Sequence, residues 1–308
     1  MASARSAETV QGSCVGFAVR SRLTFATLRS GAGTPLLVDE ALDLAPAGEL
    51  VAAWHPRPGN PFHGRLLQDG NRFAFWGSDA GWYLIDPSVP LITLSQGTGA
   101  LRRELRLFGV PTALCVLQAG DVSIHASAVE VDGQGVLLAG PSMYGKTTLA
   151  AAFARAGHRL LSEDTTRCHP ADAPTIFPGP AVVRLREDVA ASLTIAGTVA
   201  ARAEEGRVPL VFEPAARGGG GPVPLRAIMI LREAVDGLVR LEPIVPMVAT
   251  RDLFALTFGL PSAASRAACF SRVAQLAART ETLNLHRPRT VESLADVVAA
   301  VEGHLGSG

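Results

Sequence analysis

The first third of the chain has the alternation of apolar and polar positions that is typical of β-strands. The segment from Phe17 to Phe25 alternates, and two further apolar segments, 72–76 and 82–86, enclose a turn at 77–81 that begins and ends with glycine. Two apolar segments joined by such a turn predict a β-hairpin. We therefore predict a small β-rich domain over residues 1–95, with an accessory or substrate-recognition role and a linker at residues 87–99.

Most of the tryptophan and tyrosine residues of the chain fall within this predicted domain, namely Trp54, Trp76, Trp82 and Tyr83. Large aromatic side chains are typical of packed cores, and they are also enriched where proteins bind other chains. Packing inside the small domain is the favoured interpretation. A peptide-binding face is the alternative.

After residue 96 the pattern changes to strands that alternate with helices. Residues 100–108 predict a helix on which Arg102, Arg103 and Arg106 form a solvated face. Two strands follow, 126–131 and 135–139, joined by a tight turn at Asp132 and Gly133. A helix from 148 to 156 and a strand at 159–162 come next, and helical patterns recur at 251–258, 263–279 and 291–305.

These elements predict an α/β domain over residues 96–308, in which the helices cover a sheet. The strand before the glycine-rich segment at 140 is one arm of a hairpin, whereas most phosphate-binding loops follow a parallel β-α-β unit. Four consecutive glycines within residues 215–222 predict a flexible loop, which either closes over a substrate or connects two strands.

Composition and charge exclude several classes of function. The 308 residues are 48% hydrophobic and 18% charged, with a formal net charge of zero. This is a globular composition, and the neutral charge argues against a broad nucleic-acid-binding surface. No apolar run reaches the ~18 residues that span a bilayer, and the N-terminal segment has no apolar core of a secretory signal. The four cysteines are scattered without metal-type spacing, so we expect a cytoplasmic protein without a structural zinc site.

Lys146 is the only lysine among the 28 lysine and arginine residues of the chain. Where arginine replaces lysine elsewhere, a retained lysine indicates a position that needs a compact charge on a thin stem. The surrounding segment Gly140, Pro141, Ser142, Met143, Tyr144, Gly145, Lys146, Thr147 and Thr148 has the Walker A pattern G-x-x-x-x-G-K-T between a strand and a helix. Such loops bind nucleotide phosphates through their N–H groups, with the lysine on the β- and γ-phosphates and the threonine hydroxyl on Mg²⁺.

Glu163 and Asp164 stand at the end of the strand that follows the loop helix, seventeen and eighteen residues after Lys146. One helix and one strand fill this interval, so the two carboxylates are expected beside the phosphate loop. Phosphoryl transfer uses a carboxylate for the metal and often another that orients or deprotonates the attacking hydroxyl. His125 stands just before the hairpin, and on its own it is as easily a structural histidine as a functional one.

Together, the segment His125–Val129, the turn at 132–133, the loop 140–150 and the segment 156–164 resemble the C-terminal domain of HPr kinase/phosphorylase. The chain is most similar to HPr-kinase-like serine kinases that occur with ribosomal-peptide gene clusters, among them lasso-peptide tailoring kinases. The resemblance extends from about Gly97 to Leu305 and is most specific at residues 124–168. It implies a P-loop kinase core with a mixed sheet, as in HPr kinase and PEP carboxykinase, and later strands at 177–185, 225–231 and 283–289.

The resemblance further implies that Gly140–Thr148 binds ATP, that His125 lies near the transferred phosphate, and that Glu163 and Asp164 share the base and metal roles. We expect Glu163 to act on the acceptor, because the family often has aspartate there. We expect Asp164 to hold Mg²⁺ with Thr147, because its side chain is shorter. The downstream glutamate signature of the bifunctional enzymes is absent, and Val183-Arg184-Leu185 stands instead, which argues against phosphorylase activity.

Three functions remain open at this point. The first is an ATP- and Mg²⁺-dependent kinase for a serine or another hydroxyl of a peptide or protein, including a ribosomal-peptide precursor. The second is a nucleotide-binding regulatory or scaffold protein, which the bulky Met143 and Tyr144 favour. The third is a kinase for a small molecule. Related enzymes can form rings, so an oligomer is possible, but the sequence reveals no interface.

Overall fold

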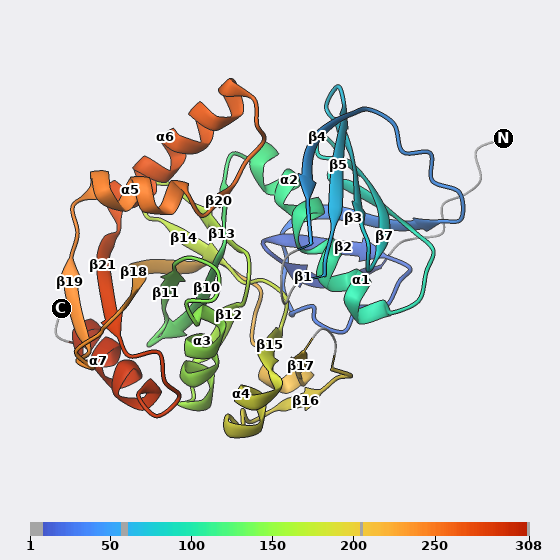
Figure 1. Ribbon diagram of the computed structural model, residues 1–308. Helices are drawn as coiled ribbons and strands as arrows, with labels where there is room; N and C mark the ends of the chain where they lie inside the picture. The colour runs from blue at the N-terminus through green and yellow to red at the C-terminus, as the bar shows by residue number, and fades with distance from the viewer. Residues whose placement is uncertain (1–8, 57–60, 204–205, 307–308) are drawn as a thin grey trace.

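The computed structural model describes residues 9–56, 61–203 and 206–306, which form a mixed α/β structure with two large sheets and one small sheet. Figure 1 shows the first sheet, coloured blue to cyan, beside the second. Its eight strands are ordered β1-β2-β3-β8-β7-β6-β5-β4. Their bounds are β1 (Val10–Cys14), β2 (Phe17–Ser21), β3 (Thr34–Ala41), β4 (Glu49–Trp54), β5 (Gly64–Asp69), β6 (Arg72–Gly77), β7 (Gly81–Asp86) and β8 (Leu91–Ser95).

The predicted hairpin is confirmed, because β6 and β7 pair antiparallel and Gly77 lies opposite Gly81. The linker predicted at residues 87–99 is wrong over its middle part. There β8 alternates half-buried and buried positions and pairs with β3 and β7, so it is an inner strand of the sheet. Pro87 and Pro90 suggested a connection, but they only flank this strand, where proline is tolerated.

Helices α1 (Ala100–Leu107) and α2 (Val110–Gln118) pack with the first sheet, and Leu107 and Leu114 belong to the same core as its buried strand residues. The solvated face predicted for α1 is wrong. Arg103 is buried and pairs with Glu40 at 2.5 Å, and Arg106 pairs with Asp79 at 2.8 Å. Both helices come after residue 95 in the chain, where we predicted the boundary between the two domains. That boundary stays a prediction.

The aromatic side chains of this region divide into two groups. Tyr83 is fully buried and donates a hydrogen bond to the Arg103 carbonyl oxygen at 2.9 Å, so it is part of the core. Trp76 and Trp82 are only partly buried, and the Arg65 guanidinium lies 5.5 and 4.9 Å from their ring centres.

The second sheet is mixed and follows the path β12-β10-β11-β18-β14-β13-β9-β20, with β21 beside β18 and β19 beside β21. Its strands are β9 (Val122–Ile124), β10 (Ala126–Val131), β11 (Gln134–Ala139), β12 (Arg159–Ser162), β13 (Thr166–His169), β14 (Thr175–Phe177), β18 (Val223–Glu233), β19 (Arg240–Pro243), β20 (Thr257–Phe258) and β21 (Glu281–Arg287). The predicted β10–β11 hairpin is antiparallel, whereas β11, β18 and β21 run parallel.

Helices cover both faces of this sheet, as Figure 1 shows. Val136 and Leu138 share a core with α3 (Lys146–Arg155) and α7 (Leu294–Gly306), whereas Leu137 and Ala139 share another with α5 (Pro246–Phe254) and α6 (Ala263–Arg279). Because side chains alternate along a strand, these two helix pairs lie on opposite faces. The bounds of α6 are as predicted. Helix α5 begins earlier than predicted because Pro246 starts the helix, and it ends at Phe254, so residues 257–258 form β20 and not the end of a helix.

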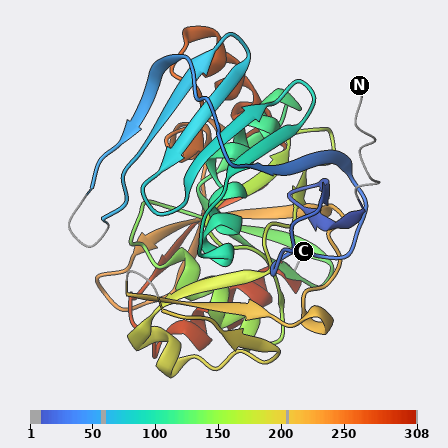
Figure 2. The same cartoon turned by 90° about the vertical axis from the view of Figure 1, so that its right-hand side faces the viewer.

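A small sheet, β15-β17-β16, and α4 (Glu187–Ser192) complete the fold at the lower edge of the molecule in Figures 1 and 2. Its strands are β15 (Val182–Arg186), β16 (Thr198–Ala200) and β17 (Arg207–Phe212), followed by the short helix η1 (Pro214–Ala216). The four-glycine segment connects β17 to β18 and is held against the N-terminal region, because the Gly220 N–H donates to the Ser30 carbonyl at 2.7 Å. Among the described residues, no helix is long and apolar enough to cross a membrane.

Candidate active site

The pairing of three strands brings the predicted site residues together. Ala126 of β10 lies opposite Ala139 of β11, so the start of β10 lies beside the loop that follows β11. On its other side β10 pairs with β12, where Ala128 lies opposite Ser162. His125, the loop 140–148 and the pair at 163–164 therefore meet at one edge of the sheet.

Lys146 begins α3 and turns back over its own loop. Its Nζ donates to the Gly140 carbonyl oxygen at 2.8 Å and to the Pro141 carbonyl oxygen at 3.1 Å. The residue is buried, and this burial lowers the pKa of the ammonium group against the raising effect of Asp164 and Glu163. The only lysine of the chain thus lies inside the loop, and the two carboxylates are the negative charges that act on its pKa.

Glu163, and not Asp164, lies against Thr147. The Thr147 hydroxyl donates to Glu163 Oε1 at 3.1 Å, and Glu163 itself is buried. The main chain of Glu163 is fixed too, because its carbonyl oxygen accepts a hydrogen bond from the Ser127 hydroxyl. The expectation that the shorter Asp164 would be held against Thr147 is therefore wrong, since the strand turns at its end and presents the two consecutive side chains to different neighbours.

Asp164 is half exposed and lies beside His125. The His125 Nδ1 is 3.3 Å from Asp164 Oδ1 and 3.1 Å from the carbonyl oxygen of the same residue. Desolvation disfavours the charged form of Asp164, but the hydrogen bond from His125 and the charges of Arg184, His125 and Lys146 outweigh it. They hold the pKa of the Asp164 carboxyl well below its usual range, so it is ionised throughout the physiological range.

Arg184 of β15 links the two carboxylates. Its Nε donates to Glu163 Oε2 at 2.8 Å, and its terminal nitrogen lies 3.2 Å from Asp164 Oδ2. The charge of Glu163, followed by that of Asp164, raises the pKa of this guanidinium against the effect of its burial. Arg184 is not among the site residues expected from the sequence, although a charge between two apolar positions of a strand is a signal that could have identified it.

Two further arginines that sequence reasoning missed hold the outer side of the loop. Arg287, at the end of β21, donates to the Tyr144 carbonyl oxygen at 2.6 Å, and Arg289 donates to the Met143 carbonyl oxygen at 2.6 Å. The Arg289 guanidinium also lies 5.2 Å from the centre of the Tyr144 ring. Burial, together with the charge of Arg289, lowers the pKa of Arg287 to about 10. No local pattern indicates these contacts, because they join segments more than 140 residues apart.

The arginine contacts fix the orientation of the loop peptides. In a trans peptide the C=O and the following N–H point in opposite directions, and the described residues contain no cis peptide. Since Arg287 holds the Tyr144 carbonyl, the Gly145 N–H points away from Arg287. Met143 has φ 69°, a left-handed conformation that is uncommon for a side chain of this kind, and its side chain is exposed.

Gly145 is expected to be indispensable for this arrangement. Its φ is 77°, and a Cβ on it would lie 2.5 Å from a terminal nitrogen of Arg287. We expect Gly145→Ala to destabilise the fold by about 1–2 kcal/mol from the left-handed backbone. The Arg287 guanidinium, at the far end of a flexible side chain, moves aside from the new methyl group, and the loss of its hydrogen bond to the Tyr144 carbonyl costs about 1.5–3 kcal/mol more. Gly133→Ala is the matched control, since Gly133 has φ 78° but open space around it. Urea unfolding measures both, and equal losses would contradict the role of Arg287.

The oxygen atoms of Thr147 and Glu163 are the best candidates for a metal in this site. Among the described residues, no group of three or more His, Cys, Asp or Glu side chains is placed to hold a metal ion. Mg²⁺ does not need such a group, because it keeps several waters and takes one or two carboxylates together with substrate phosphates. A hydroxyl and a carboxylate oxygen that lie 3.1 Å apart beside the loop fit this requirement.

Comparison with known proteins gives one local match in sequence. A segment of 63 residues is 41% identical to HPr kinase/phosphorylase from Lactobacillus delbrueckii subsp. bulgaricus, which is 20% of this chain and 20% of that protein. The chain thus shows local homology to about one fifth of the length of this relative. No protein-family model matches the chain.

Among solved structures, the HPr(Ser) kinase/phosphatase from Coxiella burnetii is similar over 60% of this chain and 97% of that chain, with 14% identity and a TM-score of 0.31. At this TM-score the structural likeness adds no argument to the local homology in sequence.

Proposed function

We propose that the chain is an ATP- and Mg²⁺-dependent kinase that transfers the γ-phosphoryl group to a serine hydroxyl of a peptide or protein. The observation that carries the proposal is the meeting of three features at one edge of the sheet. These are the loop 140–148 with its single lysine, the Thr147–Glu163 pair, and the exposed Asp164–His125 pair. The local homology to HPr kinase/phosphorylase supports the same reaction class.

In this proposal the loop binds the phosphates of ATP. The Gly145 N–H, which points away from Arg287, and the N-terminus of α3 favour a negatively charged group. Lys146 exchanges its hydrogen bonds to the loop carbonyls for hydrogen bonds to phosphate oxygens. Arg287 and Arg289 are positioning residues, because they hold the loop carbonyls on the other side.

Thr147 and Glu163 would hold Mg²⁺, which when bound neutralises phosphate charge and orients the phosphates. This reverses the division of roles expected from the sequence. Asp164 becomes the residue for the acceptor, because its side chain is exposed and ionised. His125 holds the Asp164 carboxylate in position, and Arg184 supplies a positive charge between the two acidic residues.

The proposed step is a direct displacement. The acceptor oxygen forms a bond to the γ-phosphorus while the bond from that phosphorus to the oxygen of the β-phosphate breaks, so that ADP leaves. The hydroxyl proton passes to the Asp164 carboxylate. Such a transfer depends mostly on the positioning of the reactants and on stabilisation of charge. In a loose transition state the acceptor hydroxyl loses its proton late, so a carboxylate of low basicity suffices as the base.

The acceptor is proposed to be a peptide or protein, and a ribosomal-peptide precursor is the more specific form of this proposal. It is supported by the resemblance in sequence alone. Partial exposure of Trp76 and Trp82 beside Arg65 agrees with a polypeptide-binding role of the first sheet. Oligomer formation is also proposed, and it is supported by the same resemblance in sequence alone.

Mass spectrometry of candidate acceptors tests the proposal. The purified protein, ATP and Mg²⁺ are incubated with serine-containing peptides, including any precursor peptide encoded beside the gene, and in parallel with small hydroxyl compounds such as sugars. We expect a phosphorylated serine in the peptide sample. Phosphorylation of the small compounds alone would identify a small-molecule kinase, and ATP binding without any turnover would identify a regulatory or scaffold protein.

A further inference from the structure

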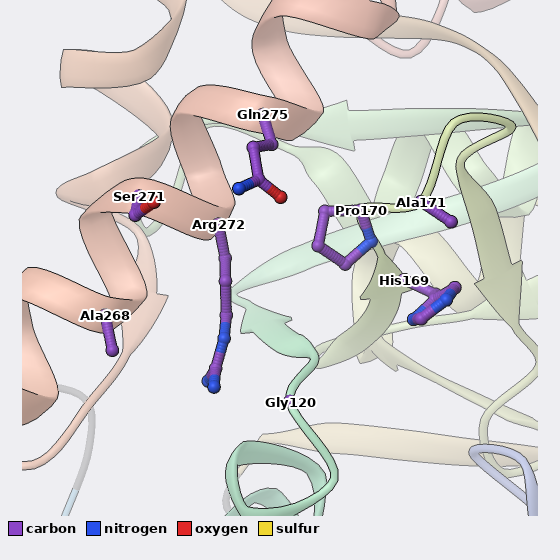
Figure 3. Close-up of a pocket in the computed structure, with 8 residues that line it drawn as sticks. All are labelled: Gly120, His169, Pro170, Ala171, Ala268, Ser271, Arg272 and Gln275. Carbon is purple, nitrogen blue, oxygen red and sulfur yellow. The ribbon is translucent and has the colours of Figure 1, made fainter.

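A polar cavity lies between α6 and the end of β13, apart from the candidate active site. Its volume is about 410 Å³, and His169, Arg272, Ser271 and Gln275 are among its lining residues. Figure 3 shows Arg272 extending from α6 toward Gly120, with His169 on the other side of the opening. None of the residues that line this cavity belongs to the loop 140–148 or to the acidic pair.

Arg272 brings an unbalanced positive charge to this cavity. Its guanidinium donates one hydrogen bond, at 3.3 Å, to the carbonyl oxygen of Leu117, and within the described parts of the chain it pairs with no carboxylate. Arg279, further along α6, differs in this respect because it pairs with Asp172 at 2.9 Å and donates to the Pro170 carbonyl at 2.8 Å. Arg272 is thus available to a negatively charged ligand.

His169 is held in one orientation by a buried carboxylate. The His169 Nδ1 lies 2.6 Å from Asp121 Oδ1, while Arg167 Nε lies 2.6 Å from Asp121 Oδ2. The Asp121 side chain is only 2% exposed, and its charge is balanced by Arg167. Because the carboxylate oxygen accepts, Nδ1 carries the proton. The Nε2 atom, which has no hydrogen bond to any described residue, therefore donates only when His169 is protonated.

We propose that this cavity binds the carboxylate group of a ligand with a small apolar body. One unpaired guanidinium matches one negative charge, and its planar fork matches the two carboxylate oxygens. The Ser271 hydroxyl and the Gln275 amide offer further polar contacts, and Pro170, Ala171 and Ala268 line the rest of the cavity. The proposal is independent of the proposed phosphotransfer.

The charged groups around His169 are Asp121, which precedes β9, Arg167 on its own strand, and Arg272 and Arg279 on α6. Because Asp121 holds Nδ1, Nε2 is the ring nitrogen left for a contact with the ligand.

Calorimetric titration with benzoate tests this inference without any need for enzymatic activity. We expect benzoate to bind the wild-type protein, and Arg272→Gln to weaken binding by ~10-fold or more. Arg272→Lys, which keeps the charge but loses the fork, is expected to be intermediate. Arg266→Gln, on an exposed position of the same helix, is the control and should bind as the wild type does.

Further probes identify the source of the carboxylate. Acetyl-dialanine tests a peptide C-terminus, its amide is the matched neutral probe, and inorganic phosphate tests a different anion. If the ligand is a free acid, we expect binding of benzoate alone. If it is a peptide C-terminus, we expect binding of acetyl-dialanine but not of its amide. Absence of binding by either carboxylate, equal binding to Arg272→Gln and Arg266→Gln, or preference for phosphate would overturn the inference. Thermal unfolding of each variant verifies that it is folded.

Discussion

Replacement of Lys146 by alanine is expected to lower the rate of phosphoryl transfer by ~10³-fold or more and to leave the fold intact. The reason is that Lys146 Nζ is the only ammonium group on the loop, and its present partners are two loop carbonyls that a phosphate can replace. Lys146→Arg is expected to transfer poorly as well, because a planar fork is too wide for the interior of the loop.

Steady-state kinetics with ATP and an acceptor peptide that the wild-type protein phosphorylates measure this effect. Arg155→Ala is the control on the same helix, since Arg155 is exposed at its C-terminal end. Circular dichroism should give the same spectrum for both variants as for the wild type. Near-normal turnover by Lys146→Arg would contradict the assignment of the loop to the phosphates of ATP.

The second large effect is expected at the acidic pair, where the two residues should fail in different ways. Asp164→Asn is expected to reduce the transfer rate by ~10²-fold or more with little change in the affinity for Mg²⁺ and ATP, as for the loss of a general base. Glu163→Gln should instead weaken the response to Mg²⁺, so that added metal partly restores activity, because Glu163 is the carboxylate that contacts Thr147.

Titration of Mg²⁺ against both variants distinguishes the two roles. The Arg184→Gln variant must be measured in the same titration, because each acidic substitution also removes a charged partner of Arg184. If excess metal rescues Asp164→Asn but not Glu163→Gln, the division expected from the sequence is correct after all. If neither substitution affects transfer, both carboxylates have a structural role and the kinase proposal loses its second support.

Local patterns predicted the elements around the site well. The β10–β11 hairpin, the loop before α3 and the strand that ends at Ser162 follow from glycine positions and from apolar segments of the right length. The approximate neighbourhood of Lys146, Glu163 and Asp164 follows as well, because only one helix and one strand separate them.

Side-chain direction at the site was not predictable in the same way. Whether Glu163 or Asp164 faces Thr147 depends on the turn at the end of β12 and on the Ser127 hydroxyl that holds the Glu163 carbonyl. Arg184 reaches the site from a strand of the small sheet, Arg287 from the end of β21 and Arg289 from the segment after β21. All three neighbour the site only in the folded chain. Long-range partners of this kind leave no periodic pattern in the sequence. The same holds for Asp121 and His169 at the cavity beside α6.

The most direct test of the central claim is a ³¹P NMR time course of the protein with ATP, Mg²⁺ and a mixture of serine-containing peptides. A phosphomonoester resonance that grows together with that of ADP, and that is lost with Lys146→Ala and Asp164→Asn, is the expected result. Release of inorganic phosphate without a phosphomonoester, or ATP that stays bound and unchanged, would contradict the claim that this edge of the sheet is a phosphotransfer site.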